Sequence, residues 1–325
     1  MLKRGVYAAS LSVLNKDLTL NVEATISHAE KLIKNGLHGC FFFGSTGMSQ
    51  LISKNEKMEL ISKISTHKLR KQFFLGTGCN SLNENIELIK YASEFNFNTI
   101  LLMPSAYYVG NSDEGVFQFY KRIISACPKI KIVIYNFQKL SGYLFSVEAI
   151  SKLVEAFPKN IIGVKDSSYN LYENLKIKDF LVFPGSEAKL LKGLEKGSSG
   201  IISACTNTTH SLARKVFDDF ENKTTQTKND QLVQVRQTFD DYHLIDVLNK
   251  DNELPDCRWT CQNMYFYRKA CIAITKQIFD VKICVVRRKL CSIIRKQMFK
   301  GGVFGGVDLA DPNKFNSEYF IGQSL

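Results

Sequence analysis

The stretch IIGVKDSS, residues 161–168, is a short apolar run that ends in a lysine, an aspartate and two serines. Its length, its β-branched residues and the polar turn after it are typical of a strand buried inside a fold. Lys165 therefore stands at the carboxyl end of a predicted strand. A charged side chain at the end of a buried strand is explained if all the strands of the fold end together at one polar edge.

Runs of the same kind recur along the chain, and we predict a strand in each: GVYAASLSVL (5–14), HGCFFFG (38–44), QFFLGTG (72–78), NTILLMP (98–104), KIVIYN (131–136), IIGVKD (161–166), FLVFPG (180–185) and GIISAC (200–205). Amphipathic segments with apolar residues at i, i+3, i+4 and i+7 predict helices at 21–36, 54–67, 83–96 and 146–160. Strands that alternate with helices eight times predict an α/β fold, the (β/α)8 TIM barrel, followed by a C-terminal helical segment.

A doubly wound open sheet is the competing architecture. It predicts fewer strands and usually a glycine-rich turn after the first one. Residues 11–17, LSVLNKD, contain no glycine, so the barrel is favoured.

The chain divides into a barrel domain, expected over residues 1–225, and a C-terminal helical segment, expected over 226–325. The segment NDQLVQVRQTFDDYHLI (229–245) predicts its first helix. From about residue 246 the composition changes, since five of the nine cysteines and the single tryptophan, Trp259, fall there. This region is a divergent helical cap, an extension, or a segment translated out of the ancestral frame.

Composition narrows the possible partners. No run approaches the roughly 18 apolar residues that a membrane-spanning helix needs, and Ser10 and Ser12 interrupt the N-terminal apolar stretch, which favours a strand over a signal peptide. The net charge of +12 is spread over the chain with acids between the bases, which is typical of a solvated surface. We expect no membrane and no nucleic-acid partner. A basic helix at 274–299 that binds either one is the less favoured interpretation.

The nine cysteines form no CxxC pair and the five histidines show no zinc-ligand spacing. Cys40, Cys79, Cys127 and Cys205 lie in or beside apolar runs and are interpreted as small buried side chains of a reducing compartment. We therefore expect a cytoplasmic protein without a metal.

Polar and glycine-rich segments follow the predicted strands at 44–47, 76–78, 104–108, 135–136, 165–166 and 185–187. In a barrel these ends meet on one rim, where active sites are built. A strand-end lysine is usually a surface residue, Tyr135 alone is more often a core aromatic, and GSTG (44–47) is often a tight turn. Together they suggest an amine nucleophile, a phenol that relays protons and backbone N–H groups that bind an anion.

These motifs, in this order, resemble the dihydrodipicolinate synthase and N-acetylneuraminate lyase family of pyruvate-dependent class I aldolases. The matching elements are GSTG (44–47), GTGCNS (76–81), PSAYY (104–108), YN followed by SG (135–142), GVKDSS (163–168) and GSSGIIS (197–203). The resemblance runs from about residue 5 to residue 245. It implies the same barrel fold.

The resemblance implies that Lys165 forms a Schiff base with pyruvate and that Tyr135 transfers protons. Ser45 and Thr46 take the places of the pair that binds the pyruvate carboxylate and hands protons to Tyr135. Tyr108 matches a tyrosine that, in the synthases, reaches across a subunit interface into the neighbouring site, so the catalytic residues implied are Lys165, Tyr135, Ser45, Thr46 and Tyr108. No cofactor is implied, because the protonated imine is the electron sink. The residues expected to bind substrate are Ser45, Thr46, Gly47, Leu140, Gly185, Glu187 and Ser203.

Three departures bear on the substrate. Leu140 stands where the synthases carry an arginine for the aldehyde's carboxylate, and leucine cannot pair with a carboxylate. Met48 replaces a glutamate of the sialate lyases, and their pair of acids is reduced to Glu187 followed by Ala188. We therefore expect an aldolase for a 2-keto-3-deoxy sugar acid or a related hydroxy-keto acid. The synthase is the nearest alternative and the sialate lyase the next.

The expected partners are pyruvate, an aldehyde or keto-acid substrate, and further copies of the chain, since the resemblance implies a tetramer. A second class of function is a catalytically degenerate barrel with a binding role. The unusual tail favours that class, whereas the presence of Lys165, Tyr135, Ser45 and Thr46 favours an active enzyme.

Overall fold

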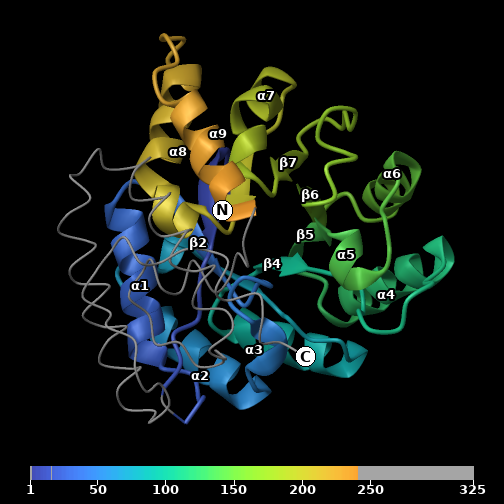
Figure 1. Ribbon diagram of the computed structural model, residues 1–325. Helices are drawn as coiled ribbons and strands as arrows, with labels where there is room; N and C mark the ends of the chain where they lie inside the picture. The colour runs from blue at the N-terminus through green and yellow to red at the C-terminus, as the bar shows by residue number, and fades with distance from the viewer. Residues whose placement is uncertain (1, 16, 241–325) are drawn as a thin grey trace, which may run out of the picture. The chain divides into compact units, whose positions relative to one another are not determined.

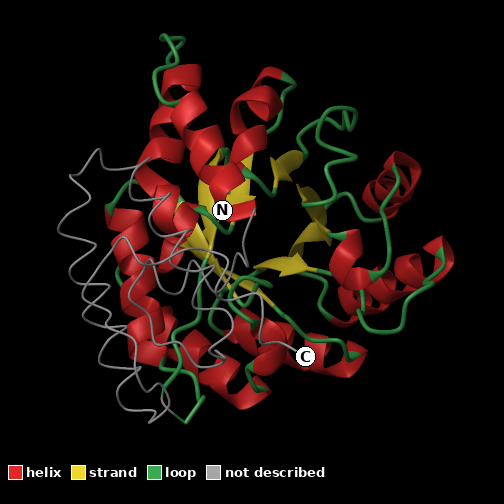
Figure 2. Ribbon diagram, in the orientation of Figure 1, coloured by secondary structure: helices red, strands yellow, loops and turns green. Residues whose placement is uncertain are grey.

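The structure is a computed structural model that describes residues 2–15 and 17–240. Within these residues the chain forms one eight-stranded, all-parallel sheet, in the order β7-β6-β5-β4-β3-β2-β1-β8. The strands are β1 (Gly5–Ala9), β2 (Gly39–Phe42), β3 (Phe73–Gly76), β4 (Thr99–Leu102), β5 (Lys131–Asn136), β6 (Ile161–Asp166), β7 (Leu181–Pro184) and β8 (Gly200–Ser203). Figure 2 shows them encircled by helices. The predicted TIM barrel is confirmed.

The sheet curls until its two end strands, β7 and β8, face each other. They are joined just outside β8 by Ser199, whose N–H donates to the Val182 carbonyl at 2.7 Å and whose Oγ accepts from the Val182 N–H at 3.2 Å. On the other side of β8, Val6 pairs with Ile201 along a regular parallel ladder. The barrel is therefore closed on all but one seam by strand pairing.

The helices around the barrel are α1 (Val22–Lys34), α2 (Lys54–Ser65), α3 (Leu82–Glu94), α4 (Asp113–Ala126), α5 (Gln138–Ser141), α6 (Val147–Ala156), α7 (Leu190–Glu195), α8 (Thr206–Glu221) and α9 (Asn229–Asp240) (Figure 1). Short 3-10 turns occur at η1 (Ser49–Leu51), η2 (Arg70–Gln72) and η3 (Glu187–Lys189). Asn21, Ser53, Ser81, Ser112 and Ser146 cap five of the helices by accepting a backbone N–H. No helix among the described residues is long and apolar enough to cross a membrane.

Two details differ from the predicted alternation. Residues 167–180, between β6 and β7, form turns rather than an α-helix. The cause is Asp166, whose carboxylate accepts the backbone N–H groups of Tyr169, Leu171 and Tyr172 and folds the chain back on itself. The first strand also ends at Ala9, because the N–H groups beyond it turn to side chains: that of Leu11 donates to Asn207 Oδ1 at 3.3 Å and that of Val13 to the Thr25 hydroxyl.

Two apolar cores hold the barrel. The larger lies between the strands and the helices, and the smaller fills the inside of the barrel. Tyr7 is central to the inner core, where its ring meets Phe41, Phe74 and Phe183 edge-on at 5.7 to 5.9 Å. These aromatic side chains make the barrel a packed core rather than a pore, so a ligand is confined to the rim.

The helix predicted at 229–245 is present as α9, which contacts α8 and η3. The remaining predictions for the tail, from residue 241 onward, lie outside the described residues.

Candidate active site

Lys165 lies on the inner face of the barrel, near the carboxyl end of β6. Its register partners are Tyr135 on β5 and Phe183 on β7, and partners in parallel strands point to the same face. The side chain is buried, with 3% exposure, and its Nζ lies 4.1 Å from the centroid of the Tyr135 ring. The strand ladder therefore brings the predicted amine and the predicted phenol into contact.

The Tyr135 hydroxyl is in turn hydrogen-bonded to Ser45 Oγ at 2.8 Å. Ser45 comes from the loop after β2, so this contact crosses the inside of the barrel between strands distant in sequence. Either oxygen can be the donor. The pair is thus a hydroxyl chain that begins beside the Lys165 amine and ends in the GSTG loop.

The GSTG loop is held in a strained conformation. Phe43 and Met48, the residues on either side of it, have φ angles of 60° and 51°, a region that costs side-chain-bearing residues energy and often marks a functional site. Gly47 is needed because a Cβ there would lie 2.8 Å from the Ser10 carbonyl oxygen. Thr46 is buried. Within the described residues, the backbone N–H groups of Thr46 and Gly47 donate to no protein acceptor.

The predicted substrate residues at β7 and β8 form a different arrangement. Glu187 is fully buried, and its Oε2 accepts from Ser203 Oγ at 2.7 Å and from Arg236 Nη1 at 3.0 Å. Ser203 Oγ also lies 3.2 Å from the Gly185 carbonyl oxygen. Arg236 bonds Asp240 on its own helix at 2.8 Å. The predicted trio of Gly185, Glu187 and Ser203 is therefore brought together, but around an arginine of α9.

Sequence reasoning missed Arg236, because a single cation in an amphipathic helix looks like a solvated residue. The available signal was weak: its neighbours Val235 and Phe239 mark the buried face of α9, and position 236 is next to that face. Asp166 was also given no role, although its Oδ1 accepts from Asn136 Nδ2 at 2.9 Å and so supports the end of β5 beside Tyr135.

Tyr108 and Leu140 lie on the outer part of the rim. Tyr108 is 80% exposed and Leu140 42% exposed, so neither packs into the site of its own chain. Tyr107, next to Tyr108, has a φ of 78° and is equally exposed. The loop after β4 therefore holds two phenol rings out in solvent at an energetic cost in its backbone.

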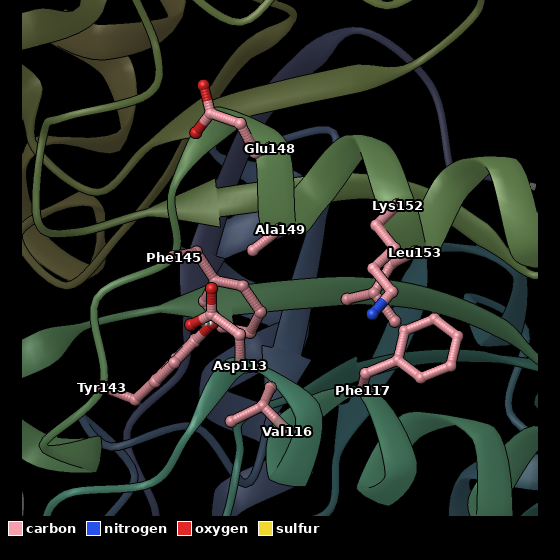
Figure 3. A pocket seen from close by; sticks show the side chains of 9 residues that line it. All are labelled: Asp113, Val116, Phe117, Tyr143, Phe145, Glu148, Ala149, Lys152 and Leu153. Atoms are coloured by element: carbon pink, nitrogen blue, oxygen red, sulfur yellow. Dashed lines mark hydrogen bonds between the residues drawn. The ribbon is translucent and has the colours of Figure 1, made fainter.

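A hollow outside the barrel, between α4 and α6, is separate from this rim (Figure 3). Tyr143 donates to Asp113 at its edge, at 2.8 Å, and Lys152 lies over the Phe117 ring at 4.7 Å. None of the predicted site residues lines it. The predicted site residues therefore lie at the rim and not in this hollow.

The described residues contain no group of three or more His, Cys, Asp or Glu side chains placed to hold a metal ion.

Comparison with known proteins places this chain in a family. Residues 2–250 match the sequence profile of the Dihydrodipicolinate synthetase family. A 4-hydroxy-tetrahydrodipicolinate synthase of Pelagibacter ubique is 32% identical over 222 residues, which are 66% of this chain and 73% of the relative.

Two solved structures share the fold. One is YagE, a prophage protein of E. coli K12 solved with pyruvate, which has a TM-score of 0.76 and 20% identity over 85% of this chain and 99% of its own. The other is a 2-keto 3-deoxygluconate aldolase of Picrophilus torridus, with a TM-score of 0.68 and 23% identity over 78% of this chain and 94% of its own.

The barrel and the family match together define a lyase of the aldolase or synthase type that uses pyruvate. The match covers most of the chain, including every rim residue discussed above. The chain belongs to the dihydrodipicolinate synthetase family, which confirms the resemblance seen in its motifs.

Proposed function

We propose that this protein is a class I aldolase in which Lys165 forms a Schiff base with pyruvate. One observation supports it above all others: a buried lysine amine lies 4.1 Å from the ring centroid of Tyr135, whose hydroxyl is bonded to Ser45 at 2.8 Å. A nucleophile beside a proton relay is what imine chemistry requires.

The reaction begins when the neutral amine of Lys165 attacks the keto carbon of pyruvate. The carbinolamine then loses water, and Tyr135 supplies and recovers protons through its bond to Ser45. The imine withdraws electrons, so a proton leaves the pyruvate methyl group and an enamine forms. The enamine carbon attacks an aldehyde, or in reverse the bond between C3 and C4 of a 2-keto-4-hydroxy acid breaks and pyruvate is released. Lys165, Tyr135 and Ser45 are the catalytic residues of this proposal.

The GSTG loop is the proposed binding site for the pyruvate carboxylate. The N–H groups of Thr46 and Gly47 have no acceptor among the described residues, and such groups in a tight turn form an anion site. The buried hydroxyl of Thr46 adds a further donor. Gly47 keeps the loop against Ser10 and so fixes the direction of these donors.

The proposed second substrate is the aldehyde part of a 2-keto-3-deoxy sugar acid or a related hydroxy-keto acid. The support is Leu140 on α5, at the position where a synthase places an arginine. Lys139, its neighbour, is solvent-exposed. An aldehyde with hydroxyl groups needs no guanidinium at this place, whereas one with a carboxylate does.

A synthase for 4-hydroxy-tetrahydrodipicolinate is the second candidate, because the Pelagibacter relative at 32% identity carries that name. Assays of pyruvate with aspartate semialdehyde, and of pyruvate release from 2-keto-3-deoxygluconate, separate the two. Sialate cleavage is the third reaction to assay.

A homotetramer in the cytoplasm is also proposed. Tyr107, Tyr108 and Val109 form a strongly exposed apolar loop at the rim, and a second copy of the chain would bury it. In such an assembly Tyr108 would enter the neighbouring site. Light scattering after gel filtration tests the assembly, and a monomer with full activity would contradict the role of Tyr108.

The Schiff base is tested by intact mass after incubation with pyruvate and borohydride. We expect the reduced adduct on the wild type and its absence from Lys165→Ala. Lys189→Ala is a matched control, since Lys189 is a rim lysine that also lies near an aromatic ring, 5.9 Å from the centroid of Tyr169; it should keep the adduct. No adduct on folded wild type would favour a degenerate barrel with a binding role.

A further inference from the structure

Lys57, on α2, is a lysine buried outside the proposed catalytic group. It is 2% exposed, and its Nζ donates to the Gly78 carbonyl at 3.2 Å and lies 3.6 Å from Cys79 Sγ. No carboxylate forms an ion pair with it within the described part of the chain. A buried amine without a carboxylate is unusual, because burial disfavours its charged form.

Cys79 differs from the other cysteines that the structure describes. Cys40, Cys127 and Cys205 are buried, whereas Cys79 is partly exposed in the loop between β3 and α3. Its Sγ also lies 3.3 Å from the Thr77 carbonyl oxygen. Cys79 is therefore the one cysteine among the described residues that is not fully enclosed, although it packs against the larger core.

The thiol and the amine have pKa values shifted towards each other. Burial raises the pKa of Cys79, and the positive charge of Lys57 only partly opposes it. Burial lowers the pKa of Lys57, and Cys79 only partly opposes that. The charged groups nearby are Lys54, Glu56 and Glu84. Both shifts favour the uncharged pair, so the Lys57 amine keeps the lone pair with which it acts as a base and as a nucleophile.

We propose that Lys57 and Cys79 form a redox modification site, in which peroxide oxidises the thiol and the Lys57 amine then captures the sulfur in a reversible S–N bond. The assignment rests on the 3.6 Å contact, the burial of Lys57 and the position of Cys79 in a loop where the residue is only partly buried. It does not depend on the Schiff-base proposal.

Both steps balance with hydrogen peroxide as the only added reactant. In the first, the thiol proton passes to the Lys57 amine, sulfur attacks one peroxide oxygen, and the O–O bond breaks to give a sulfenic acid and, after proton return, water. In the second, the neutral amine attacks sulfur, the S–O bond breaks, and a second water leaves. Sulfur is oxidised by two electrons and the peroxide is reduced. A free thiol reverses the link by attacking sulfur and releasing the amine.

The link would fix a loop that contacts the rest of the rim. Gly78 lies so near Ser49 of η1 that a Cβ at 78 would be 2.3 Å from the Ser49 Cβ. Asn80, next to Cys79, accepts from Ser105 Oγ at 2.6 Å and from the Ala106 N–H at 3.0 Å. Both neighbours belong to loops that hold proposed site residues, Thr46 on one side and Tyr108 on the other.

Peptide mapping of the full chain after peroxide treatment tests the proposal. We expect a cross-linked peptide pair joining positions 57 and 79, lighter than its two parts by two hydrogen atoms and separated again by dithiothreitol. Lys57→Met should replace it with a dimedone-reactive sulfenic acid at Cys79, formed several-fold more slowly. Lys54→Met is the matched control, because Lys54 lies on the same helix but pairs with Glu87; it should keep the cross-link.

Two results would overturn the proposal. One is a wild-type protein whose Cys79 stays a free thiol at peroxide concentrations that oxidise other cysteines of the chain. The other is oxidation of Cys79 that stops at sulfenic acid or forms a disulfide, at the same rate in wild type and Lys57→Met. Even if Lys57→Met does not fold, peptide mapping of the wild type shows whether the cross-link between positions 57 and 79 forms.

Discussion

The two halves of the barrel rim hold polar side chains in opposite ways. On the side of β5 and β6, Lys165 lies against Tyr135, and the Tyr135 hydroxyl is bonded to Ser45 from the loop after β2. No carboxylate among the described residues bonds the Lys165 amine. On the side of β7 and β8, Glu187 is bonded to Ser203 and to Arg236. The first half holds the groups that we propose react with a substrate, whereas in the second half Glu187 is bonded within the protein.

This difference teaches that position on a catalytic rim does not make a residue catalytic. A buried carboxylate bonded to an arginine contributes to the fold, and its removal leaves an uncompensated charge. A buried amine bonded to no carboxylate is free to react. The bonding partners, rather than the strand end, separate the two roles.

The largest effect is expected for Lys165→Arg, which keeps a cation in the reactive half but cannot form an imine. We expect a loss of kcat on the order of 10⁴-fold or more, as when a nucleophile is removed from other enzymes, with the fold unchanged by circular dichroism. The kcat of both proteins is measured from the steady-state rate of pyruvate release. Residual activity within tenfold of wild type would show that the lysine acts only by its charge.

A smaller loss is expected for Tyr135→Phe, which removes the hydroxyl and keeps the ring beside Lys165. General acid and base groups contribute about 10² to 10⁴-fold, so kcat should fall within that range while the borohydride adduct still forms slowly. The kcat of Ser45→Ala should fall less than that of Tyr135→Phe, since water can replace the Ser45 hydroxyl. Equal rates for Tyr135→Phe and wild type would remove the proton relay from the mechanism.

In the bonded half, Glu187→Gln should change stability more than catalysis. Arg236 loses its buried counter-ion but keeps Asp240, so the free energy of unfolding should fall by about 3 kcal/mol, measured in urea. KM should stay within a few-fold of wild type. The double variant Glu187→Gln, Arg236→Met should recover part of the loss. A KM raised tenfold or more, with stability intact, would instead show that Glu187 binds substrate, as the family resemblance implied.

The smallest expected effect is a change in stability with pH that depends on His28. This residue is hydrogen-bonded at 2.8 Å to Asn207 of α8, the helix that follows β8. Burial lowers the pKa of His28, and the bond to Asn207 only partly offsets this. The unfolded chain binds a proton near pH 6.5 and the folded one resists it, so this contribution to stability is lost as the pH falls below that value. We expect a slope of up to about 1.4 kcal/mol per pH unit.

Unfolding in urea between pH 7 and pH 5.5 measures the slope. His28→Gln should make the slope shallower and leave kcat unchanged. Identical slopes for the two proteins would show that His28 is protonated equally in both states.

The sequence predicts most of the fold because hydrophobic periodicity is a local signal. All eight strands lie within the predicted runs, and serine and asparagine caps mark helix starts. The region after β6 could not be predicted, because its turns depend on three backbone N–H groups that converge on one carboxylate, Asp166. Such convergence has no periodicity to detect.

The candidate site, like the fold, is predicted only in part from the sequence. Lys165 and Tyr135 follow from strand ends, because parallel strands in register bring such ends together. The pairing of Glu187 with Arg236 does not follow, since these residues are far apart in the chain and only the docking of α9 brings them into contact. The contact of Lys57 with Cys79 was missed for a similar reason, because it joins a helix to a loop.

The pairing of β1 with β8 determines when this barrel can be completed during synthesis. Val6 on β1 pairs with Ile201 on β8. Strand β1 therefore leaves the ribosome long before β8, its second neighbour in the sheet, has been made. Until then β1 has one unpaired edge, and unpaired apolar edges are where nascent chains associate. A fragment that stops before Gly200 keeps that edge permanently and should aggregate. The last strand, which holds none of the groups proposed to react, is therefore the one that protects the newly made chain from aggregation.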